Sequence, residues 1–140
     1  MTERFEFFDH TADIGAHIYG RTLEELFRHA AAALFEVLGQ FQKSGTVGQR
    51  SVELEAPSLE DLLHDWLAEL LYELESNHML YDDLEIRQVD SHGMKALVRG
   101  GAIDFTRSQI NEEIKAITYH QLCVESLPDG TWRATVIFDV

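Results

Sequence analysis

Cysteine, proline and positive charge are all scarce in this sequence of 140 residues. The single cysteine, Cys123, excludes an internal disulfide. Two prolines and a hydrophobic content of 45% argue against disorder, and no apolar run reaches the roughly 18 residues that a membrane-spanning helix needs. The opening residues, MTERFEFFDH, lack the pattern of a secretory signal. We therefore expect one soluble domain over residues 1–140, located in the cytoplasm and not in a membrane.

Lysine and arginine number only 11 against 25 aspartates and glutamates, which gives a formal net charge of -14. Binding to a phosphate backbone depends on Lys and Arg side chains that displace counterions. The composition therefore argues against tight, direct binding to nucleic acid. An acidic surface suits a basic protein partner or a bound cation, and it serves solubility equally well.

Several motifs of catalysis and cofactor binding are also missing. The chain has no G-x-S-x-G, no G-x-x-x-x-G-K-[ST] loop and no H-E-x-x-H, and its seven histidines follow no ligand spacing. Cys123 falls inside a predicted strand and not at the sharp turn that a nucleophile needs. These absences argue against nucleophilic catalysis, standard nucleotide binding and structural zinc.

Hydrophobic periodicity predicts two long amphipathic helices, over residues 22–38 and 58–75. Thr22 opens the first and Ser58 the second, each with an acidic residue three positions later, which is the spacing of a capping box. In both segments the apolar residues recur at intervals of three and four. Each helix should therefore bury one face in the core.

Alternating apolar and polar residues predict strands over much of the remaining chain. The segment 100–113 indicates a loop or a broken helical turn, and PDG at 128–130 predicts the turn of a final hairpin. Six or seven strands that do not alternate regularly with the helices predict an α+β domain, mainly antiparallel, whose helices cover one face of one sheet. The predicted strands span 4–8, 13–19, 51–56, 84–89, 94–100, 114–124 and 132–140.

Carboxylates are the remaining candidates for a functional site. Asp13 begins a predicted strand, and Asp139 adjoins the carboxylate of Val140 at the end of another. If Asp13 came close to these two groups, a hard cation with oxygen ligands, calcium or magnesium, would relieve the repulsion. Spacing alone does not bring residue 13 beside residue 139, and solvated carboxylates remain the alternative. We interpret His10 as a turn residue and His120 as a satisfied sheet histidine.

Four stretches, taken in order over nearly the whole chain, resemble the archease family. The first and last contain the candidate carboxylates, so the resemblance joins the two ends of the sequence. The stretches are DHTADIG at 9–15, LEDLLHDWLAELLYELE at 59–75, IKAITYHQLCV at 114–124 and VIFDV at 136–140.

The resemblance implies a non-catalytic helper of RtcB-type RNA ligases, which join RNA ends in tRNA splicing and RNA repair. Such a helper promotes transfer of GMP onto the active-site histidine of the ligase and allows multiple turnover. The resemblance also implies a metal site at Asp13, Asp139 and Val140. The implied cofactor is a divalent metal ion, calcium first, with magnesium or manganese as alternatives.

This sequence departs from the family pattern at Gly101 and Ser108, both in the segment 100–113, which puts any family role of that segment in doubt. Two other functions remain open. The first is a small metal-dependent hydrolase that uses the same carboxylates with His10 or His120 as base. The second is a general chaperone or binding module that recognises basic clients through its acidic surface.

Overall fold

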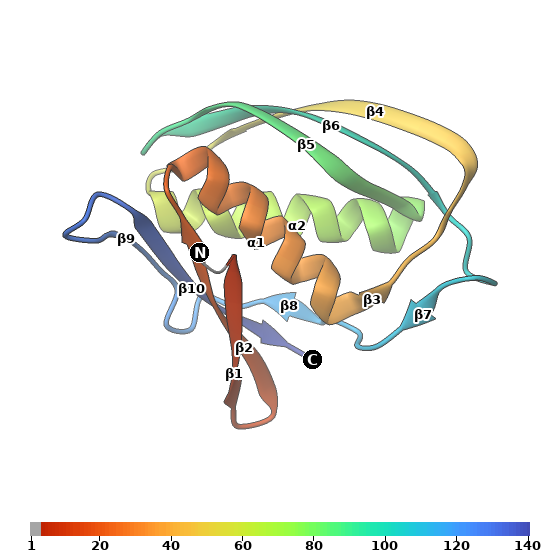
Figure 1. Ribbon diagram of the computed structural model, residues 1–140, viewed down its shortest axis with the longest axis horizontal. Coiled ribbons are helices and arrows are strands. Elements are labelled where there is room, and N and C mark those ends of the chain that lie inside the picture. Colours follow the sequence, from red (N-terminus) through yellow and green to blue (C-terminus); the bar gives the residue numbers. More distant parts are fainter. Residues whose placement is uncertain (1–3) are drawn as a thin grey trace.

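Two long helices lie between two antiparallel β-sheets in the computed structural model, which describes residues 4–140 (Figure 1). Both helices contact strands of both sheets. The predicted α+β class, with mainly antiparallel strands and two amphipathic helices, is confirmed. In chain order the elements are β1 (Phe5–His10), β2 (Asp13–Gly20), α1 (Leu23–Leu38), β3 (Gly39–Gln40), β4 (Lys43–Glu55), α2 (Leu59–Asn77), β5 (Met79–Val89), β6 (Gly93–Ile103), β7 (Gln109–Ile110), β8 (Ala116–Ile117), β9 (Cys123–Ser126) and β10 (Trp132–Asp139).

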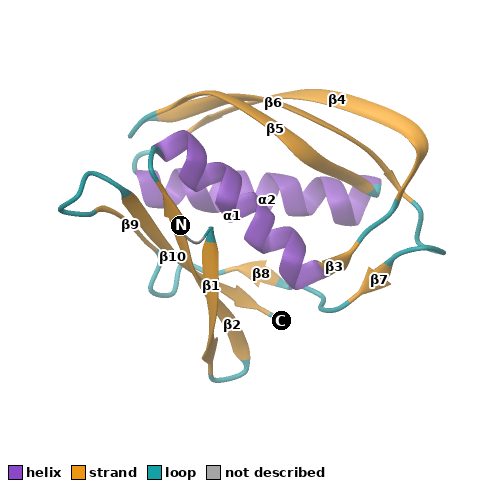
Figure 2. Ribbon diagram, in the orientation of Figure 1, coloured by secondary structure: helices purple, strands orange, loops and turns teal. Residues whose placement is uncertain are grey.

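The larger sheet has the strand order β1-β2-β10-β8, and β9 also pairs with β10. Because β2 occupies one edge of β10 along nearly its whole length, β8 and β9 share the other edge. The second sheet has the order β4-β6-β5, and the short strands β3 and β7 form a separate ribbon. Figure 2 shows the two sheets on opposite sides of the helices. Among the described residues, no helix combines the length and the apolarity that crossing a membrane requires.

Both helices begin at the predicted caps. The Thr22 hydroxyl accepts a hydrogen bond from the Glu25 amide, and the Ser58 hydroxyl accepts one from the Asp61 amide, each over 3.1 Å. Helix α1 ends at Gly39, whose φ of 154° favours glycine. A side chain at this position would also collide with the Gln109 carbonyl of β7.

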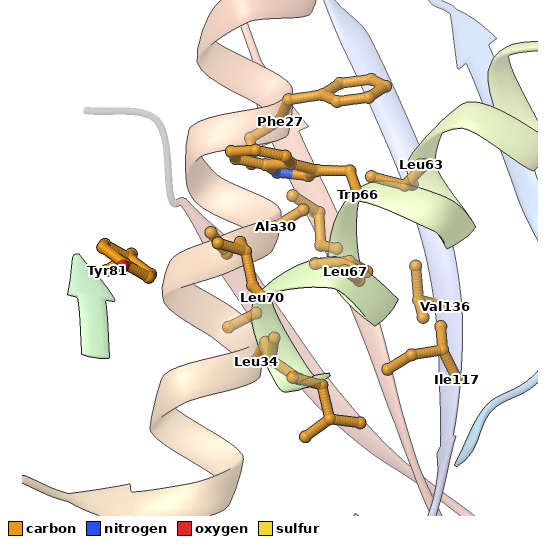
Figure 3. Close-up of a cluster of buried hydrophobic side chains, with 14 of the residues drawn as sticks. Phe27, Ala30, Leu34, Leu63, Trp66, Leu67, Leu70, Tyr81, Ile117 and Val136 are labelled. Atoms are coloured by element: carbon orange, nitrogen blue, oxygen red, sulfur yellow. The ribbon is translucent and has the colours of Figure 1, made fainter. Parts of the chain in front are cut away.

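The core between the helices centres on Trp66 (Figure 3). Its indole N–H donates a hydrogen bond to the carbonyl oxygen of Phe27 over 3.0 Å, which satisfies the buried donor and joins α2 to α1. Ile117 and Val136 of the larger sheet and Tyr81 of the smaller sheet belong to the same cluster. The helices contribute Ala30, Leu34, Leu63, Leu67 and Leu70 to the part shown in Figure 3.

The expectation that the helices cover one face of one sheet is wrong, since they are covered on two sides. The physical reason is visible on α1, where the adjacent residues Ala30 and Ala31, and likewise Ala33 and Leu34, are all fully buried. A helix buried over so much of its circumference needs a second layer. The smaller sheet provides this layer, and its strand β4 begins at Lys43, well before the predicted start at residue 51.

The prediction of one continuous strand over 114–124 is also wrong. The chain pairs with β10 at Ala116–Ile117, leaves it, and returns at Cys123–Ser126. Between these strands the Thr118 hydroxyl donates to the Ile137 carbonyl and accepts from the His120 amide, and Gln121 adopts a φ of 55°. We call residues 118–122 the 118–122 turn; it interrupts the alternation that the sequence suggests.

Candidate functional site

Asp13 and Asp139 lie at the same end of the larger sheet. Strands β2 and β10 are antiparallel, and their ladder ends with the pair Ile14 and Phe138. Asp13 precedes Ile14 and Asp139 follows Phe138, so the two aspartates occupy the next pair of opposed positions on the two strands. Opposed residues of antiparallel strands have Cβ atoms about 5 Å apart. The register of the sheet therefore brings together two residues that spacing alone could not.

Both aspartates point away from the helices. Phe138 is fully buried in the core, and side chains alternate between the two faces of a sheet. Asp139 and Asp13 consequently lie on the outer face, where both are partly exposed. The two carboxylates are accessible to an ion or to a partner.

Main-chain pairing and core packing fix the end of β10. The Lys115 amide donates to the Asp139 carbonyl over 2.7 Å, and Asp139 pairs with Ala116 of β8. Val140 follows directly, and its side chain packs against the core. Val140 is thus held next to Asp139 and not on a free tail, as the predicted ligand set requires.

No lysine or arginine forms an ion pair with either aspartate within residues 4–140. The only charged or titratable partner of Asp13 there is His10, whose Nδ1 lies 3.9 Å from a carboxylate oxygen, too far for a hydrogen bond. Across the same residues, no group of three His, Cys, Asp or Glu side chains could hold a metal ion. A cation at this place would need oxygens beyond those of the two aspartate side chains.

His10 is the last residue of β1 and flanks the turn of the first hairpin, so its interpretation as a turn residue is wrong by one position. It pairs with Asp13 across a two-residue turn whose first residue, Thr11, has a φ of 56°. The His10 ring lies 5.0 Å from the His120 ring, and its Nε2 is 3.2 Å from the side-chain nitrogen Nε2 of Gln121. Its Nδ1 is buried and has no hydrogen-bond partner among the described residues.

His120 lies in the 118–122 turn and is exposed, so the interpretation of His120 as a sheet histidine is wrong. The turn brings it over the end of the first hairpin, beside His10. Two histidines that are far apart in the sequence thus lie side by side, and one of them, His10, approaches Asp13. The sequence contained the residues, but only the turn explains their proximity.

His64 of α2 holds the 118–122 turn in place, a role that the sequence did not suggest. Its Nε2 lies 2.8 Å from the Ile117 carbonyl oxygen, which can only accept, so Nε2 carries a proton. Nδ1 lies 3.1 Å from Oδ1 of Asp65 and 3.2 Å from the Tyr119 hydroxyl, and the rings of His64 and Tyr119 stack 4.1 Å apart. Burial and the negative charges of Asp65 and Asp61 raise the pKa of Tyr119.

Cys123 lies in β9, within a strand as predicted. Burial, together with the carboxylates of Glu125 and Glu60, raises the pKa of its thiol. A raised pKa keeps the side chain protonated and weakly nucleophilic. The carboxylate pair thus remains the stronger candidate site.

Sequence comparison relates the chain to one family over almost its whole length. Residues 5–140 match the model of the Archease protein family (MTH1598/TM1083). Protein archease of Thermococcus gammatolerans is 39% identical over 140 residues, which cover 98% of this chain and 99% of the relative. Protein archease of Methanosarcina barkeri is 36% identical over 142 residues, which cover 99% and 97%.

Two solved structures share the fold. The solution structure of protein 1598 of Methanobacterium thermoautotrophicum has a TM-score of 0.73 at 32% identity, covering 98% of this chain and 99% of the other. The crystal structure of an archease from Thermotoga maritima, described as a possible chaperone, has a TM-score of 0.68 at 25% identity, covering 95% and 94%. The arrangement of helices and sheets is therefore that of the archease structures.

Proposed function

The chain belongs to the archease family, and on that premise we propose that it is a non-catalytic activator of an RtcB-type RNA ligase in tRNA splicing and RNA repair. The activator promotes guanylylation of the ligase and allows it to turn over repeatedly. The observation that carries the proposal is the register of β2 and β10, which aligns Asp13 and Asp139 without a lysine or arginine of the described residues paired to either.

In this proposal Asp13, Asp139 and the Val140 carboxylate hold a divalent cation. The donors are all oxygens and all anionic, which fits calcium first, with magnesium or manganese as alternatives. Calcium takes six to eight oxygen ligands, so water or groups of the ligase would complete the shell. The bound ion supplies positive charge at this end of the larger sheet, where the partner docks.

The net charge of -14 supports docking at a basic surface of the ligase, such as its phosphate-binding cleft. Opposite charges on the two proteins would accelerate encounter and orient the carboxylate end toward the ligase. The same charge disfavours direct contact with RNA. The expected partner is thus the enzyme and not its substrate.

The test is RNA ligation by the cognate ligase at substoichiometric enzyme, with GTP and metal, in the presence and absence of this protein. We expect the wild type to convert a single turnover into multiple turnovers and Asp139→Asn to lose this effect. Asp83→Asn is the matched control, because Asp83 is exposed on β5 and has no side-chain partner among the described residues. Full stimulation by Asp139→Asn would refute the carboxylate mechanism.

A general chaperone is the second candidate, because the Thermotoga maritima structure is described as a possible chaperone. It predicts that the protein suppresses heat aggregation of unrelated basic proteins as well as it assists the ligase. The hydrolase alternative predicts that the isolated protein turns over some substrate when divalent metal is present. Either result without ligase stimulation would replace the proposed function.

A further inference from the structure

A hollow of about 280 Å³ lies where α1 and α2 end and the segment 105–114 crosses them. Six of its ten lining residues are apolar, among them Leu74, Phe105 and Ile110. The hollow is smaller than the cavities of about 300–1,000 Å³ that hold drug-sized ligands. Its size suits one or two inserted side chains better than a cofactor.

Two of the apolar lining side chains are unusually exposed. Phe105 is 44% exposed and Ile110 is 62% exposed. Each is nevertheless held in position: Phe105 makes an edge contact with the His78 ring at 5.2 Å, and Ile110 pairs with Gly39 in the β3–β7 ribbon. Exposed apolar groups on a fixed frame are typical of an interaction surface.

The charged lining residues are all acidic. Glu75, Glu112 and Glu113 line the hollow, and no lysine or arginine does so within the described residues. None of the three carboxylates forms an ion pair in that part of the chain. Burial, and then the charge of Glu113, raise the pKa of Glu75. A partner that fits this surface must bring positive charge together with apolar surface.

We propose that this hollow is a docking site for a protein segment that inserts an apolar side chain and flanks it with lysine or arginine. The hollow and the carboxylate end are connected through neighbouring residues of the chain, because Ile114 lines the hollow and the backbone amide of the next residue, Lys115, donates to the backbone carbonyl of Asp139. The identity of the partner rests on the proposed function: the segment would belong to the RNA ligase. The hollow gives that partner a second contact beside Asp13 and Asp139.

The test does not require the ligase. The probe is a hexapeptide with leucine and phenylalanine between two pairs of lysines, titrated into ¹⁵N-labelled protein at 150 mM NaCl and followed by NMR. We expect shift changes concentrated at residues 105–114. A peptide with two serines in place of leucine and phenylalanine should bind about tenfold more weakly, because charge alone remains.

Ile110→Ser should also weaken binding about tenfold, whereas Val47→Ser, which changes another exposed apolar residue outside the hollow, should leave it unchanged. The double variant Glu112→Gln and Glu113→Gln should weaken binding in a salt-dependent way without disturbing the apolar lining. Shift changes elsewhere, or equal binding of the serine peptide, would overturn the proposal.

Failure of the proposed function gives a different result. Asp139→Asn should bind the peptide as the wild type does, because the carboxylate pair does not line the hollow. Ligase stimulation that survives Asp139→Asn refutes the metal mechanism and leaves the peptide result intact. Loss of peptide specificity with normal ligase stimulation refutes the hollow alone.

Discussion

Trp66 has the largest fully buried side chain among the described residues, and it links the two helices through a single hydrogen bond. Trp66→Phe removes the donor to Phe27 and leaves a void where the indole was. We expect a loss of about 2–3 kcal/mol in the free energy of unfolding, from the lost bond and the cavity together. Urea denaturation followed by circular dichroism measures it. Tyr72→Phe on the exposed face of the same helix should change stability by less than about 0.5 kcal/mol.

Gly15, in the DHTADIG stretch, lies beneath the ring of Phe8. The two residues pair across β1 and β2, and a side-chain carbon at position 15 would collide with that ring, which is also stacked on His17 at 4.6 Å. Gly15→Ala should therefore cost about 1–3 kcal/mol by overpacking. Gly45→Ala is the matched control, since a methyl group there meets open space. Equal stability of the two variants in thermal unfolding would contradict the role assigned to Gly15.

Single residues were only partly predictable from the sequence. Asp13 and Asp139 stand out as carboxylates beside apolar strands, but their proximity depends on the pairing of β2 with β10, which no local pattern encodes. His64 and Tyr119 gave no signal, because each is ordinary in its own segment. Contacts between distant segments become visible only once the strands are placed.

The helices were predictable because two independent signals agree, namely the apolar period and the capping residues Thr22 and Ser58. The segment 114–124 misled because its alternation continues through residues that form a turn. Gln121 occupies a left-handed conformation that favours glycine or asparagine, so no residue type marked the break. Side-chain bonds of Thr118 decide the conformation there, and period-based reasoning does not include them.

The turn at residues 104–108, which presents Phe105 to the hollow, depends on Asp104. Its carboxylate accepts from the Thr106 hydroxyl at 2.6 Å and from the Arg107 guanidinium at 2.8 Å. These bonds, that of Thr106 first, lower the pKa of Asp104 to about 2 from an ordinary 3.8. Because the folded-state pKa is the lower one, the stabilisation is present above the ordinary value and is lost as the pH falls through about 2.

Carboxyl ¹³C NMR of the folded protein should therefore show Asp104 titrating near pH 2. Thr106→Val removes the leading hydrogen bond, so the pKa should rise toward about 4. Thr131→Val is the control, because Thr131 bonds to Asp129 in a different turn and should leave Asp104 unaffected. An unchanged pKa of Asp104 in Thr106→Val would contradict the assignment.

The arrangement of the whole molecule followed less directly from the sequence than its class did. The alternation of apolar and polar residues identifies which residues of a strand face a core, but not which strands pair. A protein with one sheet and a protein with two sheets therefore show similar alternation in sequence. The available sign of burial on two sides was the run of four alanines at 30–33 on α1, in which Ala31 and Ala33 are fully buried. The separation into two sheets places the N-terminal hairpin and β10 together, and this brings the carboxylates to one end of the larger sheet.

Calcium should stabilise the entire domain if the proposed site is correct. The ion binds the folded carboxylate arrangement and not the unfolded chain, so a hundredfold excess over its Kd adds about 2.7 kcal/mol. For a chain of 140 residues we expect a rise of several degrees in the melting temperature, reversed by a chelator.

General screening of a net charge of -14 also raises the melting temperature, so sodium chloride at equal ionic strength is the necessary reference. The calcium-specific increment should vanish in Asp139→Asn and persist in Asp83→Asn, whose carboxylate lies on the other sheet. If both variants keep the increment, calcium acts on the acidic surface as a whole, because a localised site cannot survive the loss of one of its few ligands.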